Sequence, residues 1–154
     1  MGSRVPEGGS QTARVPTVGC PSCGRGNRVR AGAAGYPHCG ACGASLPWLV
    51  DSGEADFGAV ALQSPVPVLV DLWAPWCGPC RVVSPMVERV GGELAGRLKV
   101  VKVDVDEAPA ISQRFGVRGI PTLVLLAGGR ERDRLVGAPP SSAALRSWVE
   151  ERLG

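Results

Sequence analysis

Apolar and polar positions form two kinds of pattern along residues 47–154. Short runs rich in Val, Ile and Leu predict β-strands, whereas apolar residues three and four positions apart predict helices that bury one face. The run at 66–73 is apolar and β-branched, and we expect it to be the central strand. The other expected strands are 48–50, 98–104, 122–127 and 130–136, and the expected helices are 54–61, 77–95, 109–115 and a last helix capped by Ser141.

The connections between these elements indicate the class of fold. Gly128-Gly129 separates the last two strands and is a two-residue signature of a β-hairpin, so these strands should pair antiparallel. The strand at 98–104 follows a helix and should run parallel to the central strand. The sequence therefore predicts an α/β domain over residues 47–154, with a central mixed sheet flanked by helices.

The N-terminal third of the chain has a different character. Residues 1–18 are rich in Gly, Pro, Ser and Arg without periodicity, and we expect a disordered arm there. Residues 19–46 contain four cysteines and form a second candidate module. The chain has no run of about 20 apolar residues, so we expect neither a membrane span nor a membrane partner.

A cysteine pair lies at the expected junction between the central strand and the next helix. Cys77 should stand at the helix N-terminus, where unpaired N–H groups and the helix dipole stabilise a thiolate. Cys80 should lie one turn inward, facing the sulfur of Cys77. Trp76, beside Cys77, should form the rim of a substrate surface, whereas Trp73 should lie largely in the core. This pattern predicts dithiol/disulfide exchange.

The other four cysteines have the spacing of a zinc site. Cys20 and Cys23 form one Cys-x-x-Cys pair, and Cys39 and Cys42 form another after a gap of fifteen residues. Two disulfides or four free thiols are the alternatives, and His38 is a possible substitute ligand. Disulfide scaffolds belong to secreted chains, and no secretory apolar segment stands near the start, so we favour one structural Zn²⁺ and a cytoplasmic location.

Two further features bear on this module. Gly24 and Gly43 each follow the second cysteine of a pair and permit the positive φ that such a turn needs. Val29 and Tyr36 are its chief large apolar residues, so we expect the metal to supply the folding energy.

The net charge of +3 is distributed unevenly along the chain. Five arginines outnumber one acidic residue in residues 1–50, and the remainder carries one net negative charge. Only three of these arginines lie near the cysteine pairs, and Tyr36 is the sole aromatic residue there for base stacking. The composition therefore does not favour a nucleic-acid partner.

The segment Trp73-Ala74-Pro75-Trp76-Cys77-Gly78-Pro79-Cys80 resembles the active site of thioredoxins. The resemblance extends over roughly residues 47–154 and implies the thioredoxin fold. Together with the N-terminal cysteines, the chain resembles the thioredoxin 2 group, bacterial thioredoxins with an N-terminal zinc module. Pro75 departs from the commoner pattern, in which an acidic residue often stands, and this affects only the preference for partners. Further matches are Asp71, Pro85, Lys102, Gly119-Ile120-Pro121-Thr122 and Gly137.

The resemblance implies a general protein disulfide reductase that acts on disulfide-containing proteins and is recharged by NADPH-dependent thioredoxin reductase. No bound organic cofactor is expected, since the redox centre is the dithiol itself. Gly-Pro between the cysteines favours a reductase over an oxidase or isomerase. The resemblance implies a cis peptide bond before Pro121. It implies catalytic roles for Cys77, Cys80, Asp71, Lys102 and Pro121, and substrate contacts for Trp73, Trp76, Gly78, Pro79, Gly119, Ile120 and Gly137.

Asp71 has two interpretations. The first is a proton acceptor for Cys80, with a pKa raised by burial. The second is a buried salt bridge to Lys102 with no part in the chemistry.

Two other functional classes stay open. The zinc thiolates could make the chain a redox sensor or chaperone-like module. Alternatively, the N-terminal module could be a binding adaptor on an inert scaffold, although a scaffold has no need of Asp71, Cys77, Cys80 or Pro121.

Overall fold

Five strands form a mixed sheet in the computed structural model, which describes residues 15–153. Their order across the sheet is β3-β5-β4-β6-β7. β3, β5 and β4 run parallel, and β6 is antiparallel to β4. β6 and β7 also pair antiparallel, as the hairpin signature predicts. The strands span Leu49–Asp51 (β3), Val68–Trp73 (β4), Lys99–Asp104 (β5), Thr122–Ala127 (β6) and Arg130–Val136 (β7).

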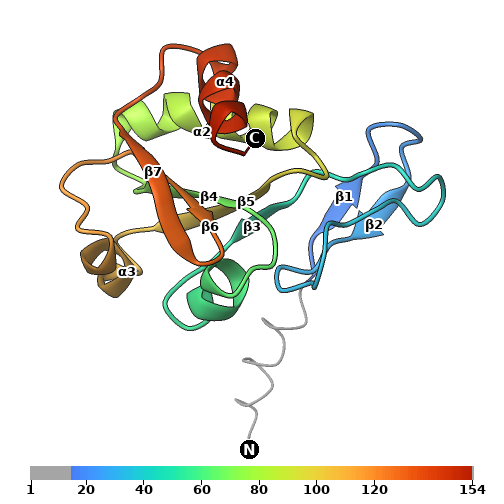
Figure 1. Cartoon of the computed structure of the whole chain (residues 1–154), viewed down its shortest axis with the longest axis horizontal. Coiled ribbons are helices and arrows are strands. Elements are labelled where there is room, and N and C mark those ends of the chain that lie inside the picture. The colour runs from blue at the N-terminus through green and yellow to red at the C-terminus, as the bar shows by residue number, and fades with distance from the viewer. Residues whose placement is uncertain (1–14, 154) are drawn as a thin grey trace, which may run out of the picture.

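Helical segments cover both faces of this sheet (Figure 1). They are the π-helical segment η1 (Gly58–Leu62), α2 (Gly78–Glu93), α3 (Pro109–Arg114) and α4 (Ser142–Leu153). α2 and α4 lie together on one face and pack against buried residues such as Leu69 and Leu125. η1 and α3 lie on the other face, where Phe57 and Phe115 meet edge to face with ring centroids 5.9 Å apart. The expected α/β architecture is confirmed.

Alternation along β4 decides which side chains reach α2. Val68, Val70 and Leu72 belong to the apolar cluster on the η1 face, so the intervening residues point to the α2 face. Asp71 is therefore directed beneath α2, and its neighbour in the parallel register on β5 is Lys102.

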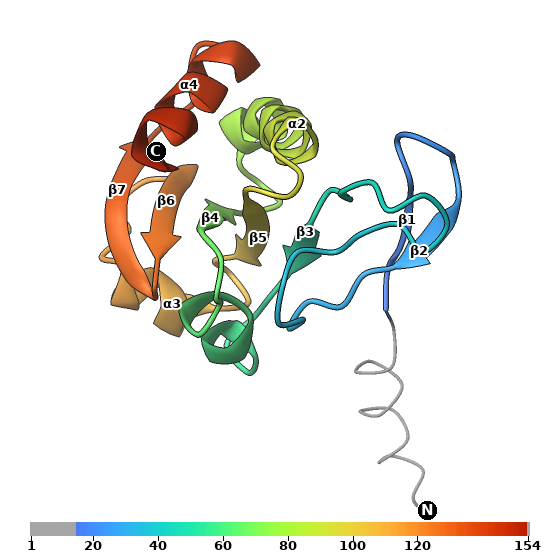
Figure 2. The same cartoon turned by 45° about the vertical axis from the view of Figure 1, so that its right-hand side comes forward.

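The N-terminal module lies beside β3, at the edge of the sheet (Figure 2). Its antiparallel strands are β1 (Thr17–Gly19) and β2 (Gly26–Arg28). Gly24 and Gly43 have φ values of 81° and 80°, as expected for the turn after each second cysteine. The module has little apolar volume of its own, and Val29 and Leu46 are buried in the same cluster as the sheet residue Val50. Packing against the larger domain therefore supplements whatever a metal contributes.

Lys99 is the polar centre of this packing. Its side chain is 1% exposed, and its Nζ donates hydrogen bonds to the carbonyl oxygens of Ala31 (2.5 Å) and Val60 (2.6 Å). The same ammonium lies 4.3 Å from the ring centroid of Trp48, whose Nε1 donates to the Arg30 carbonyl at 3.2 Å. Burial lowers the pKa of Lys99 to about 8, so the ammonium form predominates at neutral pH. One buried cation thus joins the module, η1 and β5.

Two expectations about local structure need correction. The helix expected at 54–61 is shorter and shifted: residues 54–56 are turns, and helical structure begins at Phe57 and continues through η1. At its start the Asp56 carboxylate accepts hydrogen bonds from Ser52 Oγ (2.7 Å) and the Gly53 amide (3.0 Å), as in a capping box. Thr17 and Val18, expected in the N-terminal arm, belong to β1 because they pair with β2. Residues 1–14 of that arm lie outside the described residues. Within residues 15–153 no helix is long and apolar enough to cross a membrane.

Candidate redox site and four-cysteine cluster

A disulfide joins Cys77 and Cys80 at the junction of β4 and α2, with their Cα atoms 5.3 Å apart. Cys77 is the N-cap of the 16-residue helix, and its Sγ accepts a hydrogen bond from the Cys80 amide at 3.2 Å. Gly78 and Pro79, between the cysteines, are exposed residues in the first turn of α2. A helix N-terminus and an amide donor both favour the thiolate over the thiol after reduction. The position predicted for Cys77 is confirmed.

The loop before β6 faces this disulfide. The Cys77 sulfur lies 3.8 Å from the carbonyl oxygen of Ile120, and the Ile120-Pro121 peptide bond is cis, as the resemblance implies. The Gly137 amide donates to the Pro121 carbonyl at 2.8 Å, and Thr122 Oγ1 donates to the Gly119 carbonyl at 2.5 Å. The fold thus gathers segments far apart in the sequence around Cys77.

The two tryptophans beside the site differ in exposure, as the sequence predicts. Trp76 is 68% exposed and its Nε1 donates to Asp106 Oδ2 at 2.8 Å, while Trp73 is half-buried. Asp106 was not predicted from the sequence. It could have been, because it follows the end of β5 and therefore lies at the same edge of the sheet as Cys77, which follows the end of β4.

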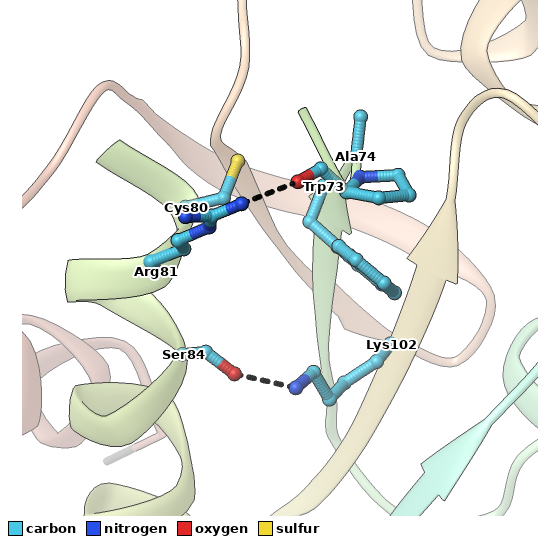
Figure 3. Close-up of a pocket in the computed structure, with 7 residues that line it drawn as sticks. Trp73, Ala74, Cys80, Arg81, Ser84 and Lys102 are labelled. Atoms are coloured by element: carbon cyan, nitrogen blue, oxygen red, sulfur yellow. Dashed lines mark hydrogen bonds between the residues drawn. The ribbon is translucent and has the colours of Figure 1, made fainter. Parts of the chain in front are cut away.

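Behind the disulfide, a pocket of about 290 Å³ opens between β4, β5 and α2 (Figure 3). Its lining residues are Trp73, Ala74, Pro75, Cys80, Arg81, Ser84 and Lys102. Lys102 Nζ donates to Ser84 Oγ at 2.5 Å and lies 3.4 Å from Glu88 Oε2. Ser84 and Glu88 were also not predicted from the sequence, because their contacts with Lys102 form only when α2 packs over the sheet.

Asp71 is the register neighbour of the pocket residue Lys102 and is 1% exposed. Its Oδ1 has no hydrogen-bond partner within the described part of the chain. Burial raises the pKa of Asp71 from 3.8 to about 6; the positive charge of Lys102 opposes this increase and the negative charge of Glu88 adds to it. The structure supports the raised pKa expected from the sequence. It does not support a direct Asp71–Lys102 salt bridge, because Lys102 bonds to α2 instead.

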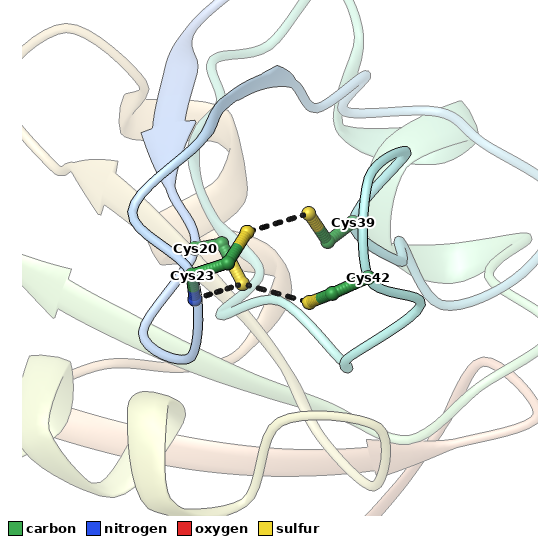
Figure 4. Close-up of side chains that lie close together, drawn as sticks. All are labelled: Cys20, Cys23, Cys39 and Cys42. Atoms are coloured by element: carbon green, nitrogen blue, oxygen red, sulfur yellow. Dashed lines mark hydrogen bonds between the residues drawn. The ribbon is translucent and has the colours of Figure 1, made fainter.

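The four N-terminal cysteines converge on one point (Figure 4). Their sulfurs all lie within 4.8 Å of one another, with Cys20–Cys42 and Cys23–Cys39 sulfur pairs at 3.6 Å. A tetrahedral Zn²⁺ with Zn–S bonds of about 2.3 Å has S···S edges of about 3.8 Å, so these donors fit a closed zinc site. All four are free thiols, and His38 is not among the grouped donors. The cluster can hold a metal ion.

Electrostatics within the cluster also favour a cation. Backbone hydrogen bonds from Cys42 and Ala41 lower the pKa of the Cys39 thiol to about 6. A hydrogen bond from the Arg25 amide lowers the pKa of the Cys23 thiol, but hydrogen bonding with Cys39 and burial outweigh it and raise this pKa to about 11. Sulfurs this close compete for negative charge, and a divalent cation removes that competition.

Comparison with known proteins agrees with this geometry. The family model for thioredoxin matches residues 48–151. The chain belongs to the thioredoxin family. It is 48% identical over 100 residues to "Thioredoxin 1" of Nostoc sp., covering 65% of this chain and 92% of that protein. It is 36% identical over 150 residues to "Thioredoxin M4, chloroplastic" of Arabidopsis thaliana, covering 94% of this chain and 76% of that protein.

A crystal structure gives the same result for the fold. The Malassezia sympodialis thioredoxin Mala s 13 superposes with a TM-score of 0.62 at 32% identity, over 70% of this chain and 91% of that one. The family match and the Cys77–Cys80 pair establish a thioredoxin-type thiol-disulfide oxidoreductase. In this thioredoxin the four-cysteine module lies outside the span matched by the family model.

Proposed function

We propose that this thioredoxin is a general protein disulfide reductase. The observation that carries the proposal is the position of Cys77, whose sulfur stands at a helix N-terminus, accepts the Cys80 amide and lies 3.8 Å from the Ile120 carbonyl on the facing loop. An extended substrate segment can lie along Gly119 and Ile120 while its disulfide meets Cys77. Trp76 and Gly137 flank that path.

In the reduced protein, the Cys77 thiolate attacks one sulfur of a substrate disulfide. A Cys77–substrate disulfide forms, and the other substrate sulfur leaves as a thiolate that takes up a proton. Cys80 then loses its proton and attacks the Cys77 sulfur. This step forms the Cys77–Cys80 disulfide and releases the second substrate thiol. Two electrons pass from the dithiol to the substrate, and the oxidised pair corresponds to the disulfide described above.

Asp71 is the proposed proton acceptor for Cys80, acting through water in the pocket. A carboxyl with a pKa of about 6 is a suitable base near neutral pH, since general acid–base catalysis works best when the pKa lies near the working pH. Lys102, which lines the same pocket, is the charged group that tunes this base. Pro121 shapes the facing loop.

For renewal of the dithiol we propose NADPH-dependent thioredoxin reductase, the usual partner of this family. We propose Zn²⁺ as the metal of the four-cysteine cluster, with a structural role, because four thiolates leave no ligand position for water. The four free thiols of the module are best preserved in a reducing compartment, and we propose the cytoplasm.

Trapping of substrates tests the reaction sequence. Cys77→Ser should abolish reduction of a protein disulfide such as that of insulin, whereas Cys80→Ser should still attack and accumulate mixed disulfides, because only the resolving thiol is missing. The double variant is the matched control and should trap nothing. Wild-type turnover by Cys80→Ser would show that the order of attack is wrong. A sensor that works through the zinc thiolates would instead keep its response in Cys77→Ser.

A further inference from the structure

The position of the Lys102 ammonium is unexpected. Lys102 and Asp71 are direct neighbours in the β4–β5 register, so their side chains start from the same face of the sheet. Nevertheless, no ion pair joins them within residues 15–153, and the Asp71 Oδ1 atom has no partner there. The lysine turns toward α2 instead (Figure 3).

Two residues of α2 hold the ammonium in that position. Ser84 Oγ accepts a hydrogen bond from Lys102 Nζ at 2.5 Å, and Glu88 Oε2 lies 3.4 Å from the same nitrogen. Ser84 and Glu88 are one helical turn apart, and the serine hydroxyl lies 3.4 Å from the glutamate oxygen. The Lys102 side chain is 18% exposed, so this arrangement operates in a partly desolvated setting where a charge–charge contact is poorly screened.

The alternative arrangement would change the chemistry of Asp71. A cation in contact with a buried carboxylate stabilises the ionised form and makes that carboxylate a weaker base. The charged groups that act on Asp71 are Lys102 from β5 and Glu88 from α2, while Cys80 and Arg81 from α2 line the pocket that Lys102 also lines. On the other side, β6 contributes apolar Leu123 as the register neighbour. Lys102 is therefore the one cation of this set whose register places it beside Asp71.

We propose that Ser84 and Glu88 are positioning residues that hold the Lys102 ammonium against α2 and thereby leave the Asp71 carboxyl free to accept and return the proton of Cys80. The role in proton transfer rests on the proposed reductase function. The positioning of Lys102 by Ser84 and Glu88 does not depend on that function. Ser84 is hydrogen-bonded to Lys102 and Glu88, not to the reacting sulfurs or to Asp71, so it acts through Lys102.

The Lys102 ammonium has free space around it. Ser84 and Lys102 line a pocket of about 290 Å³ together with Trp73 and Cys80, the Lys102 nitrogen lies 5.7 Å from the Trp73 ring centroid, and Asp71 is the register neighbour of Lys102. Removal of the serine hydroxyl should therefore let the lysine turn toward the unpartnered oxygen of Asp71 without any change in the backbone.

Titration of Asp71 in the oxidised, full-length protein tests the inference. The probe is the carboxyl carbon of Asp71, followed by NMR with ¹³C-labelled aspartate. Ser84→Ala should lower the titration midpoint by at least about one pH unit, the size of effect that an opposite charge at close range produces. Ser84→Thr keeps the hydroxyl and should restore the wild-type midpoint. Glu88→Gln should also lower the midpoint, because it loosens Lys102 and removes a negative charge.

Glu93→Gln is the matched control on the same helix. Glu93 pairs with Arg89 and Arg146 away from the pocket, and its loss should leave the midpoint unchanged. In the reduced protein, the pH dependence of mixed-disulfide resolution should move with the Asp71 midpoint in each variant. An unchanged midpoint in Ser84→Ala would overturn the inference even if the wild type is an active reductase. A wild type without reductase activity would refute the proposed function, while the NMR midpoints would still decide the position of Lys102.

Discussion

Replacement of Asp71 by Asn should make the protein more stable at neutral pH and slower in its reaction. The carboxyl is buried, one of its oxygens has no partner among the described residues, and burial raises its pKa. An ionised Asp71 therefore destabilises the folded protein. The isosteric amide removes the charge while preserving the shape of the side chain.

The magnitude follows from the pKa. A rise from 3.8 to about 6 is a difference of about two pKa units, and each unit corresponds to about 1.36 kcal/mol. The charge thus destabilises the fold by about 3 kcal/mol at pH 7. The new amide leaves a polar group without a partner, which costs about 1 kcal/mol. The net gain is about 2 kcal/mol, or about 6 °C in Tm for a protein of this size.

The stability advantage of Asp71→Asn over the wild type should grow as the pH rises. The folded protein holds the Asp71 proton more tightly than the unfolded chain, so wild-type stability falls as the pH rises from about 4 through about 6. Below about pH 4 both states are protonated, and the advantage of the variant should disappear. Thermal unfolding of the oxidised protein, followed by circular dichroism at about pH 3.5 and pH 7, measures both limits.

Asp51→Asn is the matched control, because Asp51 ends β3 with an exposed side chain, and its replacement should leave Tm nearly unchanged at either pH. Stopped-flow tryptophan fluorescence of the reduced Asp71→Asn protein should show slower resolution of the mixed disulfide and a flattened pH profile. Equal melting temperatures of wild type and Asp71→Asn at pH 7 would refute the argument from desolvation. An unaltered pH–rate profile would remove Asp71 from the mechanism.

Two further predictions concern the N-terminal module. Metal analysis should find one Zn²⁺ per chain and none in Cys39→Ser. Chelation should lower Tm yet leave the initial rate at 25 °C largely intact, because the buried residues of the module belong to the apolar cluster that contains Val50 and not to the one around Cys77. Activity that falls in step with zinc would contradict this separation. Lys99→Ala should destabilise the protein by about 3 kcal/mol, because two carbonyls lose their donor and a cavity opens beside Trp48. The control Arg97→Ala, at an exposed position, should cost less than about 1 kcal/mol. Equal losses in denaturant unfolding would contradict a buried role for Lys99.

The sequence by itself determined the elements and chemistry that depend on near neighbours. β6 and β7 have the bounds expected from their apolar pattern and from the hairpin glycines, whose φ values of 61° and 77° suit a turn with two positive φ residues. The position of Cys77 at the start of α2 and the two Cys-x-x-Cys turns also follow from local spacing. Each of these features is fixed by residues within a few positions of one another.

Only the tertiary structure decided the features that join distant segments. The indole of Trp76 donates to Asp106, which lies thirty positions away in the sequence. Lys99 is buried because the N-terminal module supplies a carbonyl, and Lys102 turns from Asp71 to Ser84 because α2 packs over that strand. Propensity and periodicity describe what a residue prefers near its own neighbours, whereas a buried charge takes its partner from whichever element the fold places beside it.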